Sequence, residues 1–266
     1  SYVDLPQNFV GSIGGWFYAR ELERIATELA GRGALPLVDE ALRAAIADEN
    51  ERRRAIADLD ALRSAEPWRI LASEAWLIVR AGTQMPATDH TQMLREFHAA
   101  VVARDVRPVD NVRVLLVGSF CEQPPLGLIR TLEKAGCDII DDDYMLGMRS
   151  IGGDIDIGEG ESALDALSRA FLEKGVPTAS RYIDEGEKGR GLIDKVADLR
   201  ADGVLFAAAS FCDPALLDQP MLEAALDRAG IPHTSFKFAE NTGQFQPIRE
   251  QAGAFSDSVK LWGAVA

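Results

Sequence analysis

The chain has 266 residues and is strongly acidic, with 42 Asp and Glu against 28 Lys and Arg and a formal net charge of −14. Nucleic acids and anionic membranes are bound by basic surfaces, so this composition argues against both classes of partner. Hydrophobic residues make up 47% of the chain, enough for a sizeable core, yet no apolar run is long enough to predict a membrane-spanning helix.

The first part of the chain, residues 1–108, is predicted to be almost wholly helical. Apolar residues recur at helical spacing in Trp16–Gly31, and glycine is expected to close that helix. Leu37–Ser64 is rich in Ala, Leu, Glu and Arg and predicts one or two further helices, until Pro67 breaks the pattern. Two more helices are expected at 73–81 and 89–103.

From residue 109 onward, short strands are predicted to alternate with helices. Val112–Gly118 is an apolar run that ends in glycine, as expected of a buried parallel strand. Further strands are expected at 137–140, 204–208 and 232–238, and helices at 126–135, 162–174, 187–200, 215–229 and 246–265. This pattern predicts an α/β protein with a helical N-terminal lobe (1–108), followed by a Rossmann- or flavodoxin-like parallel sheet (109–266) with helices on both faces.

Polar and sulfur-bearing residues follow each predicted strand. In open α/β sheets, ligands bind beyond the carboxyl ends of the strands, which all lie at the same edge. The segments expected to share that edge are Gly118–Pro125, Asp141–Arg149, Ala209–Pro214 and Glu240–Phe245. The sequence therefore predicts a functional site built from these four segments.

The residues alone leave several interpretations of this edge open. Cys121 and Cys212 are either small buried hydrophobic residues or reactive groups, whereas Cys137, at the start of a strand, is interpreted as structural. The run Asp141–Asp143 is expected to cap a helix, with Mg²⁺ binding as the alternative. The three histidines lack ligand spacing, and the glycine-rich stretch 186–191 lacks the Lys-Ser/Thr ending of a phosphate loop.

Three widely spaced cysteines argue against a disulfide framework and for the reducing cytoplasm. No Cys-x-x-Cys pair occurs, so zinc is not expected, and these cysteines alone are too few for a four-cysteine cluster. The start, Ser1–Pro6, has neither the basic nor the apolar region of a signal peptide. Because it also lacks a Met and begins with what looks like the end of a strand, we expect this chain to be a segment of a longer protein.

Three segments resemble the C-type subunits of the benzoyl-CoA reductases, within the larger 2-hydroxyacyl-CoA dehydratase D-component family. They are VLLVGSFCEQPPLGLIRTLEKAGCDIIDDDYMLGMR at 114–149, ENTGQFQPIREQAGAFSDSVKLWG at 240–263, and the opening SYVDLPQNF with the following GGWFYARELE. The resemblance extends over essentially the whole chain. It implies an enzyme subunit that helps to dearomatise benzoyl-CoA to a cyclohexadiene-carboxyl-CoA.

The resemblance also implies a cofactor and partners. In that family two homologous subunits pair, and each typically holds a [4Fe-4S] cluster through three cysteines, the last of which follows a late strand. Cys212 matches this last position. The resemblance implies that the other two ligands lie outside this chain segment, in an N-terminal domain that precedes it. Separate ATPase subunits use ATP to drive electrons from ferredoxin into the subunit pair. The lack of a phosphate loop in this chain fits ATP binding elsewhere.

The candidate substrate-binding residues lie in two of the edge segments. They are Asp143, Tyr144, Arg149, Glu240, Asn241 and Gln244. A tyrosine or a carboxylic acid among them would deliver a proton as the ring accepts an electron, although no single catalytic residue stands out.

Two other functions remain open from the sequence. The first is a 2-hydroxyacyl-CoA dehydratase subunit, with the same fold and cluster but radical elimination of water. The second is a cluster-free partner or ligand-binding subunit. The Cys-Glu-Gln-Pro-Pro and Asp-Asp-Asp-Tyr sequences, at 121–125 and 141–144, favour the reductase.

Overall fold

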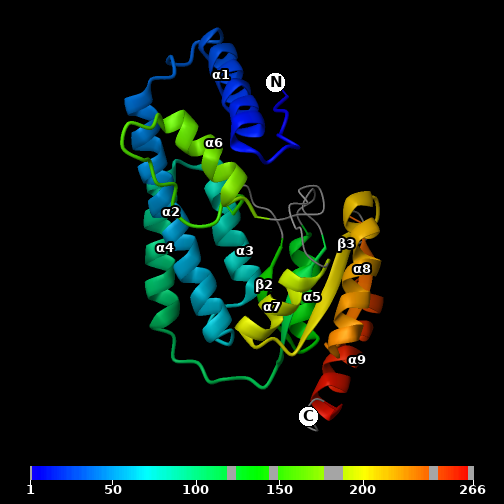
Figure 1. Cartoon of the computed structure of the whole chain (residues 1–266). Coiled ribbons are helices and arrows are strands. Elements are labelled where there is room, and N and C mark those ends of the chain that lie inside the picture. The colour runs from blue at the N-terminus through cyan, green and yellow to red at the C-terminus, as the bar shows by residue number, and fades with distance from the viewer. Residues whose placement is uncertain (1, 119–123, 144–148, 177–187, 240–244, 263–266) are drawn as a thin grey trace.

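The chain folds into a helical lobe beside an α/β sheet, as a computed structural model shows (Figure 1). The structure describes residues 2–118, 124–143, 149–176, 188–239 and 245–262. The first half contains η1 (Gly11–Gly15), α1 (Trp16–Ala30), α2 (Asp39–Ala65), α3 (Ala72–Ala81), η2 (Gly82–Gln84) and α4 (Ala87–Val102). The second half contains β1 (Val112–Val117), α5 (Leu126–Lys134), β2 (Cys137–Asp142), α6 (Ala163–Glu173), α7 (Arg190–Leu199), β3 (Gly203–Ala209), α8 (Asp213–Ala229), β4 (His233–Phe238) and α9 (Gln246–Trp262).

The long helix α2 is the central helix of the helical lobe and contacts α3, α4 and α6. Two acidic residues in its first turn, Asp39 and Glu40, stabilise the helix because their negative charge interacts favourably with the positive end of the helix dipole. It ends at Ala65 because Pro67 disfavours helical backbone at the residue before it. Its apolar face packs on α4 over a small core that includes Leu59 and Leu94. Helix α2 is therefore stabilised by tertiary packing along most of its length.

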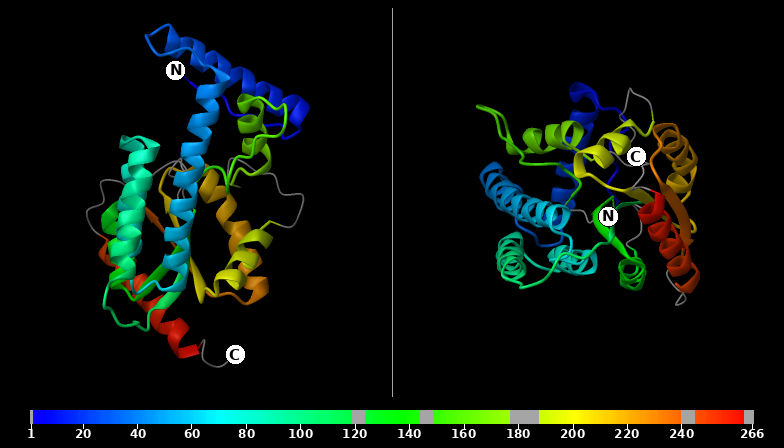
Figure 2. Two further views of the ribbon diagram at one scale, coloured as in Figure 1. Left: turned by 90° about the vertical axis from the view of Figure 1, so that its left-hand side faces the viewer. Right: turned by 90° about the horizontal axis from the view of Figure 1, so that it is seen from below.

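Helix α6 comes from the second half of the chain but packs against α1 and α2 (Figure 2). Ile46 of α2, Ile155 and the small residues Ala163 and Ala166 form a separate apolar cluster there. The lobe is thus assembled from two separate parts of the sequence, and the division at 108/109 stays a prediction. Among the described residues, no helix combines the length and the apolarity needed to cross a bilayer.

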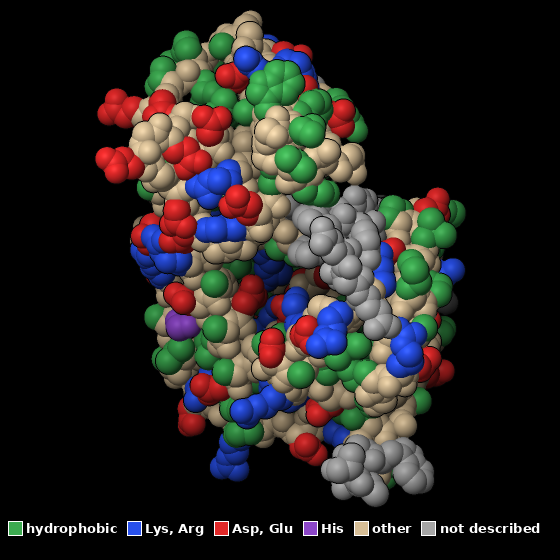
Figure 3. All heavy atoms as spheres, viewed as in Figure 1, with side chains coloured by type: hydrophobic (Ala, Val, Ile, Leu, Met, Phe, Trp, Pro, Cys, Tyr) green, Lys and Arg blue, Asp and Glu red, His purple; other side chains and the backbone are tan. Residues whose placement is uncertain are grey.

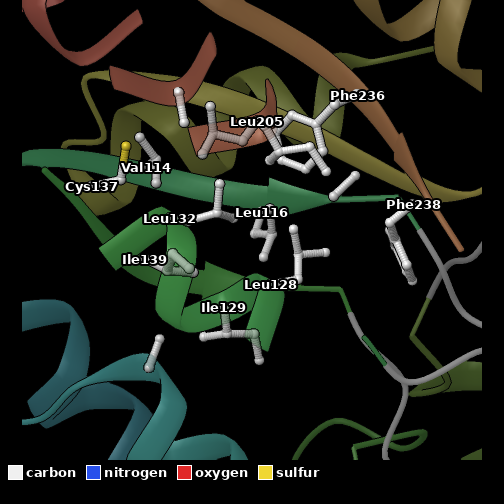
Figure 4. Packing of buried hydrophobic residues seen from close by; sticks show 14 of the residues in the cluster. Val114, Leu116, Leu128, Ile129, Leu132, Cys137, Ile139, Leu205, Phe236 and Phe238 are labelled. Carbon is white, nitrogen blue, oxygen red and sulfur yellow. The ribbon is translucent and has the colours of Figure 1, made fainter. Parts of the chain in front are cut away.

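The sheet consists of parallel strands in the order β2-β1-β3-β4. Successive side chains of a strand point to opposite faces of the sheet. Val114 and Leu116 pack with α5 and α9, whereas Leu115 and Phe206 pack with α7 and α8. Figure 4 shows the first of these layers, with Leu128 of α5 beneath β1. The predicted α/β class, with a parallel sheet and helices on both faces, is confirmed.

Strand order decides where a ligand site is expected. The chain leaves β1 through α5 to β2 on one side, while β3 pairs with β1 on the other side. This reversal between β1 and β3 is a topological switch point, where open α/β sheets form a crevice at the carboxyl edge. Gly118, Asp143 and Ser210, the residues directly after β1, β2 and β3, lie at this edge.

Truncating a buried leucine of β3 tests whether the sheet forms the core as described. Leu205 of β3 is 0% exposed, so Leu205→Ala is expected to lower the free energy of unfolding by about 2–5 kcal/mol through lost burial and a cavity. The control is Leu217→Ala on α8, where the side chain is 73% exposed and a change within about 0.5 kcal/mol is expected. Urea unfolding measures both, and equal losses would contradict this assignment of the core.

Candidate functional site

Gly118 directly follows β1 at the switch point, in a position that has no room for a side chain. Its φ is 149°, and a Cβ there would lie 2.5 Å from the carbonyl oxygen of Ala207 in β3. The Gly118 N–H donates to both carboxyl oxygens of Asp143, at 2.9 and 3.1 Å. In return, the Asp143 N–H donates to the carbonyl of Leu116 at 3.2 Å. The ends of β1 and β2 are therefore tied together by hydrogen bonds.

The three consecutive aspartates have three different environments. Asp141 pairs with Lys195 of α7, with 2.5 Å between Nζ and Oδ2, whereas Asp142 contacts two arginines. Asp143 instead accepts from the backbone of Gly118. The register of β2 against β1 shifts by one residue just before Asp141, and such a bulge re-aims the side chains that follow it. The sequence placed all three aspartates beyond the strand, but Asp141 and Asp142 belong to β2.

Asp142 belongs to a ring of charges that joins the helical lobe to the sheet. Arg63 of α2 donates to Asp142 at 2.8 Å, and Arg149 donates to the other oxygen of Asp142 at 3.0 Å. Asp60 of α2 closes the ring, with Oδ1 2.8 Å from Arg149 Nη2 and 3.3 Å from Arg63 Nη2. On the face shown in Figure 3, basic and acidic side chains intermingle where the lobe meets the α/β half.

Burying the charges of this ring costs desolvation free energy, which their mutual attraction must offset. Arg63 is only 2% exposed, and burial alone would lower the pKa of its guanidinium, but the carboxylates of Asp142 and Asp60 outweigh burial and raise it. Burial raises the pKa of Asp60, which the positive charges of Arg149 and Arg63 oppose. Sequence analysis missed Arg63, because it lies in a helix with many other arginines; its only local signal is the i, i+3 spacing from Asp60.

The carboxyl group of Asp143 is strongly perturbed. Burial raises its pKa to about 7, and the nearby charge of Asp142 adds to the increase. The hydrogen bond from the Gly118 N–H and the charge of Lys195 act in the opposite direction but do not cancel the increase. Asp143 therefore exists in both the protonated and the ionised form near neutral pH.

Cys212 lies on the other side of the switch point, where β3 leads into α8. It precedes the first residue of the helix and is 3% exposed, and its N–H donates to the carbonyl of Ala209 at 3.0 Å. The backbone N–H groups at a helix N-terminus favour negative charge, which suits a thiolate ligand of a metal. Phe211, immediately before it, is 92% exposed, a feature that the sequence alone did not reveal.

The structure brings some of the predicted site residues to the same edge. Asp143 and Arg149 lie on the β2 side, and Cys212 follows β3 with β1 between them. Because neighbouring strands are about 5 Å apart, the ends of β2 and β3 are separated by roughly 10 Å across the end of β1. The remaining predicted residues lie outside the described part of the chain: Cys121, Tyr144, Glu240, Asn241 and Gln244.

Cys137 lies away from this edge, opposite Val112 at the amino end of the sheet. Burial raises the pKa of its thiol to about 12, which leaves it protonated and unreactive. Among the described residues, no group of three or more His, Cys, Asp or Glu side chains has the arrangement of a metal site. The described residues therefore offer one buried cysteine, Cys212, to a cluster at the carboxyl edge.

Comparisons with known proteins agree with the motifs. The family model described as "2-hydroxyglutaryl-CoA dehydratase, D-component" matches residues 2–259. The C subunit of benzoyl-CoA reductase from Thauera aromatica is 45% identical over 262 residues, which cover 98% of this chain and 67% of that protein. The (R)-phenyllactyl-CoA dehydratase beta subunit of Clostridium sporogenes is 24% identical over 257 residues, covering 97% of this chain and 67% of that protein. The resemblance predicted from the motifs is confirmed.

The charge ring can be tested by removing its most buried member. Arg63→Met keeps much of the side-chain volume but leaves Asp142 and Asp60 without that cation, so a loss of about 3–5 kcal/mol in the free energy of unfolding is expected. The matched control, Arg95→Met, breaks the exposed pair with Glu51 and should cost less than about 1 kcal/mol.

Urea unfolding of both variants measures the difference. Adding Asp142→Asn to Arg63→Met should recover part of the loss, because it removes the stranded carboxylate. Equal small losses in Arg63→Met and Arg95→Met would show that the ring does not stabilise the fold.

Proposed function

Because the chain belongs to the 2-hydroxyglutaryl-CoA dehydratase D-component family, we propose that it is the C-type subunit of a reductase that dearomatises benzoyl-CoA to a cyclohexadiene-carboxyl-CoA. The observation that carries the proposal is a difference in identity. The chain is 45% identical to the C subunit of benzoyl-CoA reductase but 24–26% identical to three dehydratase subunits, with similar coverage of each. The chain spans about two thirds of each relative, so the activity is proposed for the whole enzyme.

The proposed cofactor is a [4Fe-4S] cluster with Cys212 as one ligand. A buried thiol at the start of α8 fits a thiolate ligand, and the remaining cysteines would come from outside the described residues. When bound, such a cluster supplies electrons at low potential, and iron–sulfur potentials reach about −700 mV. Low potential is needed because an aromatic ring resists the addition of an electron.

The proposed partners follow from the multi-subunit nature of the relatives. These relatives are named as C or beta subunits of their enzymes, which supports a complex of different subunits. We propose a homologous reductase subunit, ATPase subunits that use ATP, and ferredoxin as the electron donor. The reducing cytoplasm is the proposed location, because it preserves both the thiols and the donor.

The proposed contacts to the aromatic acyl-CoA are the residues predicted at the sheet edge: Asp143, Tyr144, Arg149, Glu240, Asn241 and Gln244. Of these, Asp143 and Arg149 are described, and both lie at the carboxyl edge beside the switch point. Asp142 and Asp60 already neutralise Arg149 and hold its guanidinium in place. Its proposed role is therefore to orient the substrate through a fixed hydrogen-bond donor.

Turnover by the assembled enzyme tests the proposed reaction. With ATP and reduced ferredoxin, benzoyl-CoA should be converted to the diene with net consumption of ferredoxin electrons. The dehydratase alternative returns its electron after each cycle. Dehydration of a 2-hydroxyacyl-CoA without net electron consumption, and no reduction of benzoyl-CoA, would contradict the proposal.

Iron content tests the cluster separately from the reaction. Under anaerobic conditions the assembled enzyme should contain about four irons for each copy of this subunit, beyond those of its partners. Cys212→Ala should lose this iron, whereas Cys137→Ala, which removes a thiol of similar burial, should keep it. Full iron content in Cys212→Ala would exclude this cysteine as a ligand.

A further inference from the structure

We propose that Asp143 is the catalytic acid that gives a proton to the substrate as the aromatic ring is reduced. This inference rests on the proposed function and adds a role to one residue of that site. Three neighbouring aspartates at the end of β2 differ in the groups that they contact. Only one of them is left without a cation as a direct partner in the part of the chain that the structure describes.

The three aspartate side chains differ in the groups that they bind. Asp141 forms an ion pair with Lys195, and Asp142 forms ion pairs with Arg63 and Arg149. Among the described residues, the hydrogen-bond donor to Asp143 is the N–H of Gly118. A carboxyl group with one backbone donor keeps capacity for a further hydrogen bond, which can go to a substrate.

The charges that face Asp143 come from three elements. Asp141 and Asp142 precede it in β2 and repel its ionised form, and Lys195 of α7 attracts that form. The backbone N–H of Gly118, after β1, also favours the carboxylate. Burial outweighs the attractive groups, and the pKa of about 7 matches that of an efficient acid at neutral pH.

The position of Asp143 suits proton transfer to a ligand at the switch point. Its hydrogen bonds to Gly118 hold the carboxyl group against the end of β1, the strand at the switch point. Cys212 follows β3, on the other side of β1 from β2. A ring bound beyond the end of β1 would have the acid on one side and, on the other, the cysteine proposed to hold the cluster.

Atoms and electrons balance in the proposed step. The O–H bond of Asp143 breaks, a C–H bond forms at a ring carbon, and Asp143 is left as a carboxylate that regains a proton from water. One electron enters the ring for this proton and comes from reduced ferredoxin, which is oxidised. Dearomatisation to a diene needs two electrons and two protons, and Asp143 supplies one of the protons.

The test compares Asp143→Asn with Asp141→Asn in the assembled enzyme. Asn keeps an oxygen for the Gly118 N–H but removes the acidic proton, so benzoyl-CoA reduction should fall by about 10²- to 10⁴-fold with little change in KM. Asp141→Asn changes the neighbouring carboxylate and should stay within a few-fold of the wild type. Iron content should be unchanged in both variants.

The pH profile separates an acid from a merely structural residue. The wild-type rate should fall as the pH rises above about 7, because the proton is lost there, and Asp143→Asn should lack this fall. Asp143→Glu retains an acidic proton and should retain both activity and the fall. Infrared spectroscopy gives a readout without turnover: a protonated-carboxyl band titrating near neutral pH should be present in the wild type and absent in Asp143→Asn.

Each outcome decides a different point. An Asp143→Asn enzyme as active as the wild type, or an infrared band that the variant retains, would refute the role of Asp143 alone. If Asp143→Asn does not assemble, an Asp143→Glu enzyme that assembles but has no activity at any pH also refutes it. A wild-type enzyme that does not reduce benzoyl-CoA would refute the proposed function and this inference with it.

Discussion

The ion pair between Arg63 and Asp142 is the interaction on which the geometry of the site depends. An arginine that is 2% exposed is stable only if carboxylates surround it, and those available come from α2 itself and from the end of β2. The pair therefore fixes the helical lobe against the sheet edge. Arg149, bound to the same two carboxylates, holds the chain at the far end of the segment that follows Asp143.

This constraint also explains how adjacent aspartates acquire different chemistry. The bulge before Asp141 sets the direction of the three side chains, and each then meets a different element: α7, α2 or the end of β1. Two of them, Asp141 and Asp142, form ion pairs with fixed cations. The described residues bring no cation into direct contact with the third, Asp143, and burial raises its pKa to about 7, so its protonation responds to pH. A run of identical residues thus gives a structural pair and a titratable group.

Much of the architecture was predictable because it depends on local periodicity. Helical spacing located α1, α2 and α4, and the apolar runs located β1 and β3; parallel strands then placed Cys212 at the carboxyl edge. The contact between Arg63 and Asp142 was not predictable, since it joins residues 79 positions apart and α2 looks like a solvated helix. The extension of β2 through Asp142 was missed because aspartate is rare in strands; pairing with β1 and the arginines overcame that preference.

The distribution of charge at the edge bears on the proposed reduction. Adding an electron to a ring creates negative charge, and ionised aspartates beside it would oppose the step by Coulomb repulsion. Here Asp142 and Asp141 are compensated by Arg63, Arg149 and Lys195, and a protonated Asp143 carries no charge. Transfer of the proton moves the new negative charge from the ring to a carboxylate whose Gly118 N–H is already in place to stabilise it. An acidic edge is therefore compatible with a reductive reaction, provided that one of its carboxyl groups starts neutral.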